Sequence, residues 1–252
     1  MYLIDADVVC YRIAFACKDE ELEEVERALD EFVSNIIVLG ADDCEDYQLF
    51  LTGSDNYRYQ VATILPYKGN RQGSEKPMHF HDIRYRLEEV WGAIVVEGQE
   101  ADDAMAIAAT ANPNNIIATV DKDLLQVPGR HYNFVKEEYK EVSEVEGLRF
   151  LYKQMLTGDR TDNIPGVHGI GDKKSDKILE GLTTEAELHE AVLEAYQGDI
   201  ESMTENAILL YMRRKENEWW VPYPTRMKHF DGENPTYKPD YETYFKEYSQ
   251  GV

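Results

Sequence analysis

Short apolar runs alternate with segments of helical periodicity through the first part of the chain. Four runs, rich in apolar or β-branched residues, predict buried strands: 2–4, 47–51, 93–96 and 116–120. Apolar residues recur at helical spacing over 22–36, and helices are also predicted at 87–91 and 101–110. This alternation predicts an α/β fold with a mainly parallel central sheet and flanking helices.

The pattern changes near residue 147, after which no further strand is predicted. Two helical patterns flank a turn-rich stretch at 158–171. We therefore predict an α/β domain over 1–147, a small helical subdomain over 148–215, and a C-terminal tail over 216–252 to which we assign no role.

The charge is strongly acidic overall but unevenly distributed. The chain has 26 Lys and Arg against 49 Asp and Glu, a formal net charge of −23, whereas nucleic-acid-binding proteins usually present a basic surface. The segment 58–86 is the exception, because its only acids are Glu75 and Asp82. Its basic residues are Arg58, Lys68, Arg71, Lys76, Arg84 and Arg86. A basic segment in an acidic chain is consistent with local binding of a polyanion.

Acidic residues follow each of the four predicted strands. In chain order they are Asp5; Asp55; Glu100, Asp102 and Asp103; and Asp121 and Asp123. The carboxyl ends of parallel strands meet at one edge of a sheet, so we expect these acids to converge. Converging carboxylates require cations, and oxygen ligands without His or Cys favour Mg²⁺ or Mn²⁺. So many acids predict a pair of ions suited to phosphodiester hydrolysis.

The remaining composition indicates a cytoplasmic protein that does not associate with membranes. No apolar run approaches the roughly 20 residues of a membrane helix. The cysteines Cys10, Cys17 and Cys44 form no CxxC pair, so they are expected to be reduced thiols rather than zinc ligands or disulfides.

The stretch 158–171 carries a more specific pattern, Gly-Asp-Arg-Thr-Asp-Asn-Ile-Pro-Gly-Val-His-Gly-Ile-Gly. It resembles the 5′-nuclease family, which includes phage flap endonucleases, 5′–3′ exonucleases and the N-terminal nuclease domain of bacterial DNA polymerase I. Other stretches agree with that family in the correct order: Ile4-Asp5 with Tyr11-Arg12, Tyr67–Arg71, Glu100–Asp103 and Thr119–Leu124. The resemblance covers roughly residues 1–182 and implies a PIN-like α/β domain followed by a helix–hairpin–helix subdomain.

The resemblance also implies a ligand set for two Mg²⁺ ions, for which Mn²⁺ would substitute. The first ion would be held by Asp5, Glu100 and Asp102. The second would be held by Asp102, Asp121, Asp123 and Asp159. Asp103 and Asp162 would contact the ions through water molecules or would support the residues that bind the ions directly. The family's usual aspartate after the second strand is absent here; either Asp55 replaces it through a shifted turn, or the first site has one carboxylate fewer.

Substrate contacts follow from the same resemblance. Lys68 and Arg71 would stabilise the scissile phosphate, with Arg12, Arg58 and Tyr67 binding nearby substrate. The region 57–90 would form a basic arch or clamp for a 5′ single strand. The hairpin would grip duplex DNA, and its carbonyls would bind K⁺. Its substrate-binding residues would be Gly169, Gly171, Lys173 and Lys174.

The sequence thus predicts a metal-dependent 5′–3′ exonuclease or flap endonuclease of a bacterial or phage-infected cell. Its partner would be DNA with a free 5′ end, or RNA in an RNA–DNA hybrid, and no protein partner is indicated. Two alternatives stay open. A PIN-type ribonuclease would share the acids without needing the glycine hairpin, and a non-catalytic DNA-junction protein would not need the acids.

Overall fold

A computed structural model of the chain describes residues 1–39, 46–71 and 73–223. The described residues divide into two compact units. No helix within these ranges is long and apolar enough to cross a membrane. Cys10 is buried and Cys17 partly buried, and both are free thiols. Cys44 and the tail from residue 224 lie outside the described residues.

Of the described residues, the first unit comprises 1–39, 46–56 and 73–143, and the second comprises 57–71 and 144–223. The change of unit at 143–144 lies close to the predicted boundary at 147. The predicted first domain is nevertheless interrupted, because residues 57–71 pack with the second unit. The predicted arch at 57–90 is therefore divided between two compact units.

A six-stranded sheet forms the centre of the first unit, in the order β3-β2-β1-β4-β5-β6. Its strands are β1 (Tyr2–Asp5), β2 (Tyr47–Thr52), β3 (Ile94–Val96), β4 (Ile116–Ala118), β5 (Gly129–Asn133) and β6 (Glu138–Val142). All neighbouring strands are parallel except β5 and β6. This confirms the predicted α/β fold class. The β5–β6 hairpin was not predicted, because β6 is polar and buries only Val142.

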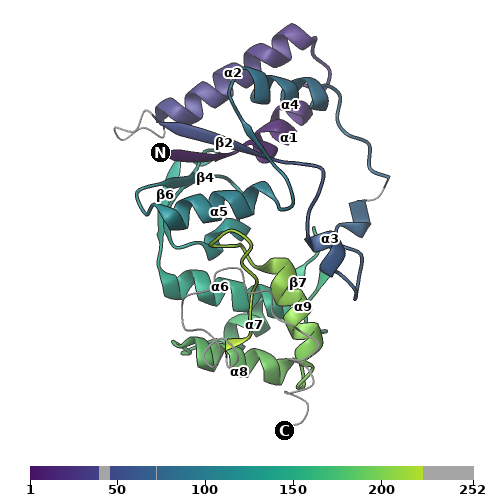
Figure 1. Cartoon of the computed structure of the whole chain (residues 1–252), viewed down its shortest axis with the longest axis vertical. Helices are drawn as coiled ribbons and strands as arrows, with labels where there is room; N and C mark the ends of the chain where they lie inside the picture. Colours follow the sequence, from purple (N-terminus) through teal and green to yellow (C-terminus); the bar gives the residue numbers. More distant parts are fainter. Residues whose placement is uncertain (40–45, 72, 224–252) are drawn as a thin grey trace. The chain divides into compact units, whose positions relative to one another are not determined.

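Helices cover both faces of this sheet (Figure 1). α1 (Ala6–Ala16), α2 (Leu22–Leu39) and α4 (Phe80–Glu89) pack together on one face, and α5 (Ala101–Ala111) covers the other. A short 3₁₀ turn, η2 (Asp123–Gln126), follows β4. Apolar side chains of α1, α2 and α4 join those of β1 and β2 in one core, with Leu29, Leu49 and Leu87 fully buried. This packing fixes the carboxyl ends of β1, β2 and β4 beside the start of α5.

The second unit is mostly helical. Its elements are α3 (Arg58–Val61), η1 (Gly69–Arg71), α6 (Glu144–Thr157), β7 (Gly158–Asp159), β8 (Ile164–Pro165), α7 (Asp172–Ile178), α8 (Glu185–Ala195) and α9 (Ile200–Leu210). The prediction that strands stop near 147 was wrong in one detail, since β7 and β8 form a short antiparallel pair. Gly158 and Gly166 allow this pair to close, because a Cβ on either would lie within 2.5 Å of the other segment's backbone.

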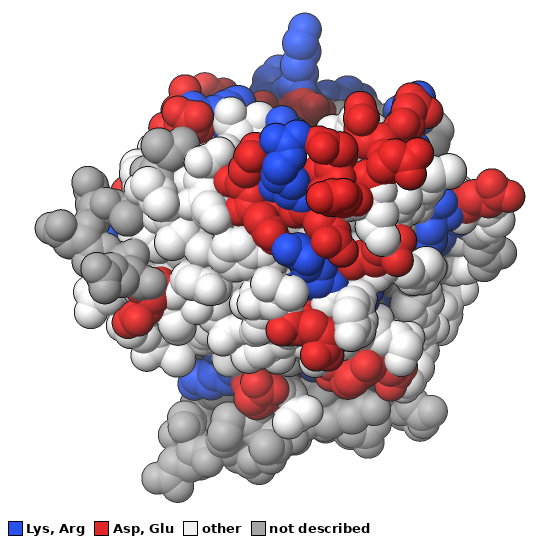
Figure 2. Space-filling model, turned by 90° about the horizontal axis from the view of Figure 1, so that it is seen from above, with Lys and Arg blue, Asp and Glu red and all other residues white. Residues whose placement is uncertain are grey.

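Acidic side chains gather on the face seen in Figure 2. In Figure 1 this is the side on which α2 and α4 lie. Many of the acids near the start of the chain belong to α2, where Arg27 pairs with Glu24 and Glu31. Arg86 of α4 pairs with Glu26 and is also held by Asp30. This face accounts for part of the negative net charge and is unsuited to binding a polyanion.

Candidate functional site

Asp5 is the last residue of β1 and also the N-cap of α1. Its side chain is 2 % exposed, accepts the backbone N–H of Val8 at 3.0 Å, and accepts the Thr119 hydroxyl at 2.7 Å. Burial raises the pKa of Asp5 to about 7, and the charges of Asp7 and Asp121 contribute in the same direction. These two hydrogen bonds oppose the rise and hold the Asp5 carboxylate in place.

Thr119 links the ends of two neighbouring strands. Its hydroxyl donates to Asp5 and accepts the backbone N–H of Asp121 at 2.9 Å. The Asp121 carboxylate in turn accepts the backbone N–H of Asp123 at 2.8 Å, which fixes the turn after β4. The structure therefore brings Asp5 and Asp121 together at one edge of the sheet, as the strand pattern predicted. Sequence reasoning named Thr119 only as the first residue of a matching stretch and gave it no role.

The start of α5 contributes the central acids. Burial raises the pKa of Asp102 well above its usual range, and four neighbouring carboxylates raise it further: Asp5, Asp121, Glu100 and Asp7. Glu100 and Asp103 form a reciprocal capping box, in which the Asp103 carboxylate accepts the Glu100 N–H at 3.2 Å. Asp103 is fully buried, so its observed role is to close the first turn of the helix that carries Glu100 and Asp102.

Asp7 is a member of this group that sequence reasoning missed. Its carboxylate lies at the end of β2, where it accepts the backbone N–H of Thr52 at 3.0 Å. Burial raises the pKa of Asp7, hydrogen bonds from Thr52 and the charge of Arg84 oppose the rise, and Glu100 adds to it. Its position two residues after Asp5 was the available signal. We refer to Asp5, Asp7, Glu100, Asp102 and Asp121 as the carboxylate cluster.

Asp55 does not join the carboxylate cluster. The turn after β2 is organised by Glu97, whose carboxylate accepts the backbone N–H groups of Ser54 at 3.1 Å and Asp55 at 3.3 Å. The Asp55 side chain is exposed. Asp55 therefore does not stand in for the missing strand-end aspartate in this arrangement, whereas Asp7 does bring a carboxylate to the end of β2.

The carboxylate cluster has the donor atoms of a divalent-cation site, but its side chains do not converge on a single ion position. All its donors are carboxylate oxygens, which suit a hard cation such as Mg²⁺. Within the described ranges, no three His, Cys, Asp or Glu side chains lie close enough, as they stand, to hold a metal ion. Like charges repel, so a cation bound among these carboxylates would offset their mutual repulsion.

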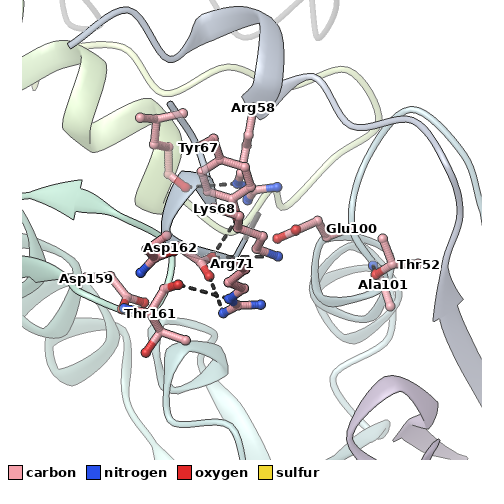
Figure 3. A network of polar contacts seen from close by, with 12 residues as sticks. Thr52, Arg58, Tyr67, Lys68, Arg71, Glu100, Ala101, Asp159, Thr161 and Asp162 are labelled. Atoms are coloured by element: carbon pink, nitrogen blue, oxygen red, sulfur yellow. Dashed lines mark hydrogen bonds and ion pairs between the residues drawn. The ribbon is translucent and has the colours of Figure 1, made fainter. Parts of the chain in front are cut away.

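A second polar cluster lies within the second unit, around Asp162 (Figure 3). Asp162 accepts the Tyr67 hydroxyl at 2.6 Å and the Arg71 guanidinium at 2.7 Å, and it lies 3.8 Å from the Lys68 ammonium. Arg71 also donates to the backbone oxygen of Thr161 at 3.0 Å. The structure thus joins two motifs that are about 90 residues apart in the chain, and both carboxylate oxygens of Asp162 are engaged by them.

These contacts revise two predicted roles. Tyr67 was predicted to bind substrate, but its ring is 4 % exposed and its hydroxyl holds Asp162. Asp162 was predicted to act at the metal site, but in this arrangement it holds the cations of the basic motif. Asp159, also in this unit, accepts the backbone N–H of Thr161 at 2.7 Å, and so orders the same loop.

The prediction that Arg58 binds substrate was wrong. Its side chain is 1 % exposed, and it donates to the backbone oxygens of Leu209 at 2.9 Å and Tyr211 at 3.0 Å. These carbonyls lie at the end of α9, where a cation is favoured by the helix dipole. The sequence could not reveal this role, because the partners lie about 150 residues away.

Replacing Arg58 with Met should destabilise the protein strongly. Two hydrogen bonds from a charged group contribute about 1.5–3 kcal/mol each. The buried methionine side chain offsets part of this loss, so we expect the free energy of unfolding to fall by roughly 2–4 kcal/mol. Urea unfolding would measure the loss. Arg160→Met is the matched control, because Arg160 is exposed in the same unit, and its effect should stay within about 0.5 kcal/mol. Equal stability of the two variants would contradict a structural role for Arg58.

Two further arginines of the basic segment also have internal partners. Arg86 is held by Glu26 and Asp30, and Arg84 lies 3.5 Å from Asp7 and 3.3 Å from Glu88. The basic segment is therefore not a continuous row of free cations. Arg12, which was predicted to contact substrate, is exposed on α1, with its guanidinium 5.7 Å from the centre of the Phe32 ring.

The glycine-rich hairpin connects β8 to α7. Gly169 has a φ of +76°, which favours glycine, and Gly171 is the N-cap of α7. Lys174 donates to the backbone oxygen of Gly169 at 2.9 Å and so stabilises the hairpin from within. Lys173 is exposed beside it. α6, the hairpin and α7 follow the order expected for a helix–hairpin–helix element.

Comparison with known proteins agrees with this architecture. Residues 1–153 match the family model of the 5′–3′ exonuclease N-terminal, resolvase-like domain. DNA polymerase I of Pseudomonas aeruginosa is 30 % identical over 145 residues, which are 49 % of this chain and 15 % of that protein. DNA polymerase I of Caldicellulosiruptor bescii is 26 % identical over 218 residues, which are 75 % of this chain and 25 % of that protein. The chain thus spans about a quarter or less of the length of these relatives.

A similar fold is found in the T5 D15 protein, which was crystallised with metal ions. That structure has a TM-score of 0.65 and 15 % sequence identity, and the match covers 83 % of this chain and 88 % of that one. A second structure of that protein, described as a flap endonuclease in complex with DNA and metal ions, has a TM-score of 0.64, with 16 % identity and the same coverage of both chains. At this level of identity the likeness establishes the fold.

Proposed function

This chain belongs to the 5′–3′ exonuclease family, and we propose that it is a magnesium-dependent nuclease that hydrolyses DNA phosphodiesters at or near a free 5′ end. The observation that carries the proposal is the carboxylate cluster. Burial and mutual repulsion raise the pKa values of Asp5 and Asp102, and a bound cation would relieve that repulsion. Relatives within this family are DNA polymerases, and DNA is the proposed substrate.

We assign the metal ligands by combining the family resemblance with the cluster. Asp5, Glu100 and Asp102 would hold one Mg²⁺, and Asp102, Asp121, Asp123 and Asp159 would hold a second. When bound, such ions lower the pKa of water and stabilise the charge on the leaving oxygen. Asp55 is left out of the proposed set, because its backbone is tied to Glu97 and its side chain is exposed.

Lys68 and Arg71 are the proposed groups that stabilise the scissile phosphate. A planar guanidinium can offer two parallel N–H donors to a phosphate, as it can to a carboxylate. Asp162 already holds Arg71 at 2.7 Å, so it would keep these cations ordered until a phosphate competes for them. Their positive charge would then oppose the negative charge that grows on the phosphoryl oxygens.

The hairpin is the proposed grip on duplex DNA. Backbone N–H groups near a helix N-terminus bind phosphate without reading sequence, and the exposed Lys173 would add a cation beside them. The hairpin also distinguishes this proposal from a PIN-type ribonuclease, which would not need it. K⁺ at the hairpin carbonyls and cleavage of RNA–DNA hybrids are further parts of the proposal.

Cleavage of a labelled duplex with a 5′ flap tests the proposed function directly. We expect Mg²⁺-dependent cleavage near the flap junction with a 5′-phosphate on the product, no turnover in EDTA, and little cleavage of a matched 3′ flap. A flap whose 5′ end is blocked by streptavidin should be cleaved much more slowly. Tight binding without cleavage in Mg²⁺ or Mn²⁺ would support a junction-binding protein instead, and selective cleavage of single-stranded RNA would support a ribonuclease.

A further inference from the structure

We propose that three side chains outside the assigned ligand set, Asp7, Thr52 and Arg84, position the metal-binding start of α5. They come from α1, the end of β2 and α4, and all belong to the first unit. We call them the Asp7–Thr52–Arg84 network. They would act as positioning residues rather than catalytic ones, and the inference rests on the proposed function of the carboxylate cluster.

Thr52 is the centre of the network. Its backbone N–H donates to Asp7 at 3.0 Å, and its backbone oxygen accepts the Arg84 guanidinium at 2.7 Å. Its hydroxyl oxygen accepts the backbone N–H of Ala101 at 3.0 Å. Arg84 also lies 3.5 Å from the Asp7 carboxylate, which closes the network on itself. The end of β2 is thereby fastened to three helices.

The bond to Ala101 is the one that reaches the proposed metal ligands. Ala101 is the first residue of α5, and its N–H is one of the helix donors that no internal carbonyl can satisfy. Its neighbours in the chain are Glu100 and Asp102, so fixing this N–H fixes the backbone that carries both carboxylates. Figure 3 shows Thr52 beside Ala101, with Glu100 extending from the same helix end.

The network also accounts for the absence of an acid directly after β2. The strand ends in Thr52 and continues as Gly53-Ser54-Asp55, with Asp55 held away by Glu97. Asp7 reaches the same strand end from α1, but its oxygens face the Thr52 N–H and Arg84. A carboxylate with these partners is better suited to hold the strand end than to bind an ion directly, since Arg84 already supplies a cation to it.

The inference can be tested with a matched pair of variants at Thr52. Thr52→Val keeps the branched shape but removes the oxygen that accepts the Ala101 N–H, whereas Thr52→Ser keeps that oxygen. The full chain would be titrated with Mn²⁺, and free Mn²⁺ measured by electron paramagnetic resonance. We expect Thr52→Val to weaken Mn²⁺ binding by about tenfold or more, as is typical when a group supporting metal ligands is lost. Thr52→Ser should bind Mn²⁺ with an affinity within about twofold of that of the parent protein.

Three further measurements separate positioning from folding. Thermal unfolding in EDTA reports the stability of each variant, and binding of duplex DNA in EDTA should remain unchanged. The cleavage rate of Thr52→Val should recover partly as Mn²⁺ is raised, which a purely structural defect would not produce. Arg84→Met provides a second variant if Thr52→Val does not fold, and it should also weaken Mn²⁺ binding.

The outcomes distinguish this inference from the proposed function. If the parent protein binds no Mn²⁺ and cleaves no flap, the proposed function fails. If the parent protein binds Mn²⁺ and cleaves DNA, but both Thr52→Val and Arg84→Met bind Mn²⁺ as tightly as it does, then the positioning role alone is overturned.

Discussion

Replacing Asp102 with Asn is expected to reduce single-turnover cleavage by at least about a hundredfold, which a misplacement of about 1 Å in a reacting group can produce. Burial and four neighbouring carboxylates raise the pKa of Asp102 well above its usual range, and Asp102 is proposed to contact both ions. The substitution keeps the shape of the side chain and removes its charge. Binding of flap DNA should persist or tighten, because less negative charge then faces the phosphates.

Although Asp102→Asn should lower the cleavage rate, it should stabilise the folded protein in the absence of metal ions. An Asp whose pKa is raised by folding stabilises the folded state at low pH, and this contribution is lost as pH rises from its unfolded value near 4 toward the folded value. Asn does not ionise, so the variant does not lose stability in this way as pH rises. In EDTA at pH 8 the variant should therefore melt at a higher temperature than the parent protein, whereas near pH 4 the difference should shrink.

Asp55→Asn is the matched control for this experiment. It makes the same chemical change at an exposed acid outside the carboxylate cluster. Its cleavage rate should remain close to that of the parent protein. A cleavage rate for Asp102→Asn within about tenfold of the parent would show that the cluster is not the metal site. An equal loss of activity in Asp55→Asn would contradict the exclusion of Asp55 from the ligand set.

Replacing Arg71 with Ala should lower the single-turnover rate by roughly a hundredfold or more, as does the loss of one donor to a developing oxyanion in other enzymes. DNA affinity should change much less, because the contact would be strongest in the transition state. Rapid-quench cleavage at saturating enzyme, together with binding in Ca²⁺, would separate the two effects. Arg71→Lys should retain part of the rate, since it keeps the charge but loses the planar pair of donors.

Two control variants accompany the Arg71→Ala experiment. Lys140→Ala removes one exposed positive charge from β6 and should leave the rate nearly unchanged. Asp162→Asn keeps an acceptor for Tyr67 but loses the ionic hold on Arg71, so we expect a smaller loss of rate than in Arg71→Ala. If Arg71→Ala and Lys140→Ala show the same small effect on affinity and none on rate, Arg71 has no role in catalysis.

Local patterns in the sequence were sufficient for the fold class and for part of the carboxylate cluster. The apolar runs predicted β1 to β4, because buried parallel strands need apolar side chains on both faces. Acids that follow those runs within a few residues predicted that Asp5, Glu100, Asp102 and Asp121 would meet. The β5–β6 hairpin was not predicted, because β6 is an edge strand that buries one residue and its composition resembles that of a loop.

Residue roles that depend on distant partners required the tertiary structure. Arg58 was predicted to contact DNA because it lies in a basic segment. Its side chain is instead buried at the end of α9, where it donates hydrogen bonds to carbonyls about 150 residues away in the chain. Asp162 and Arg71 lie 91 positions apart in the chain and are joined by a hydrogen bond. Asp7 and Thr52 lie 45 positions apart and are also joined by a hydrogen bond. Periodicity and strand-end position are properties of neighbouring residues, so the sequence determines them directly. The partner of a charged side chain is set by how whole elements pack, and only the folded chain decides it.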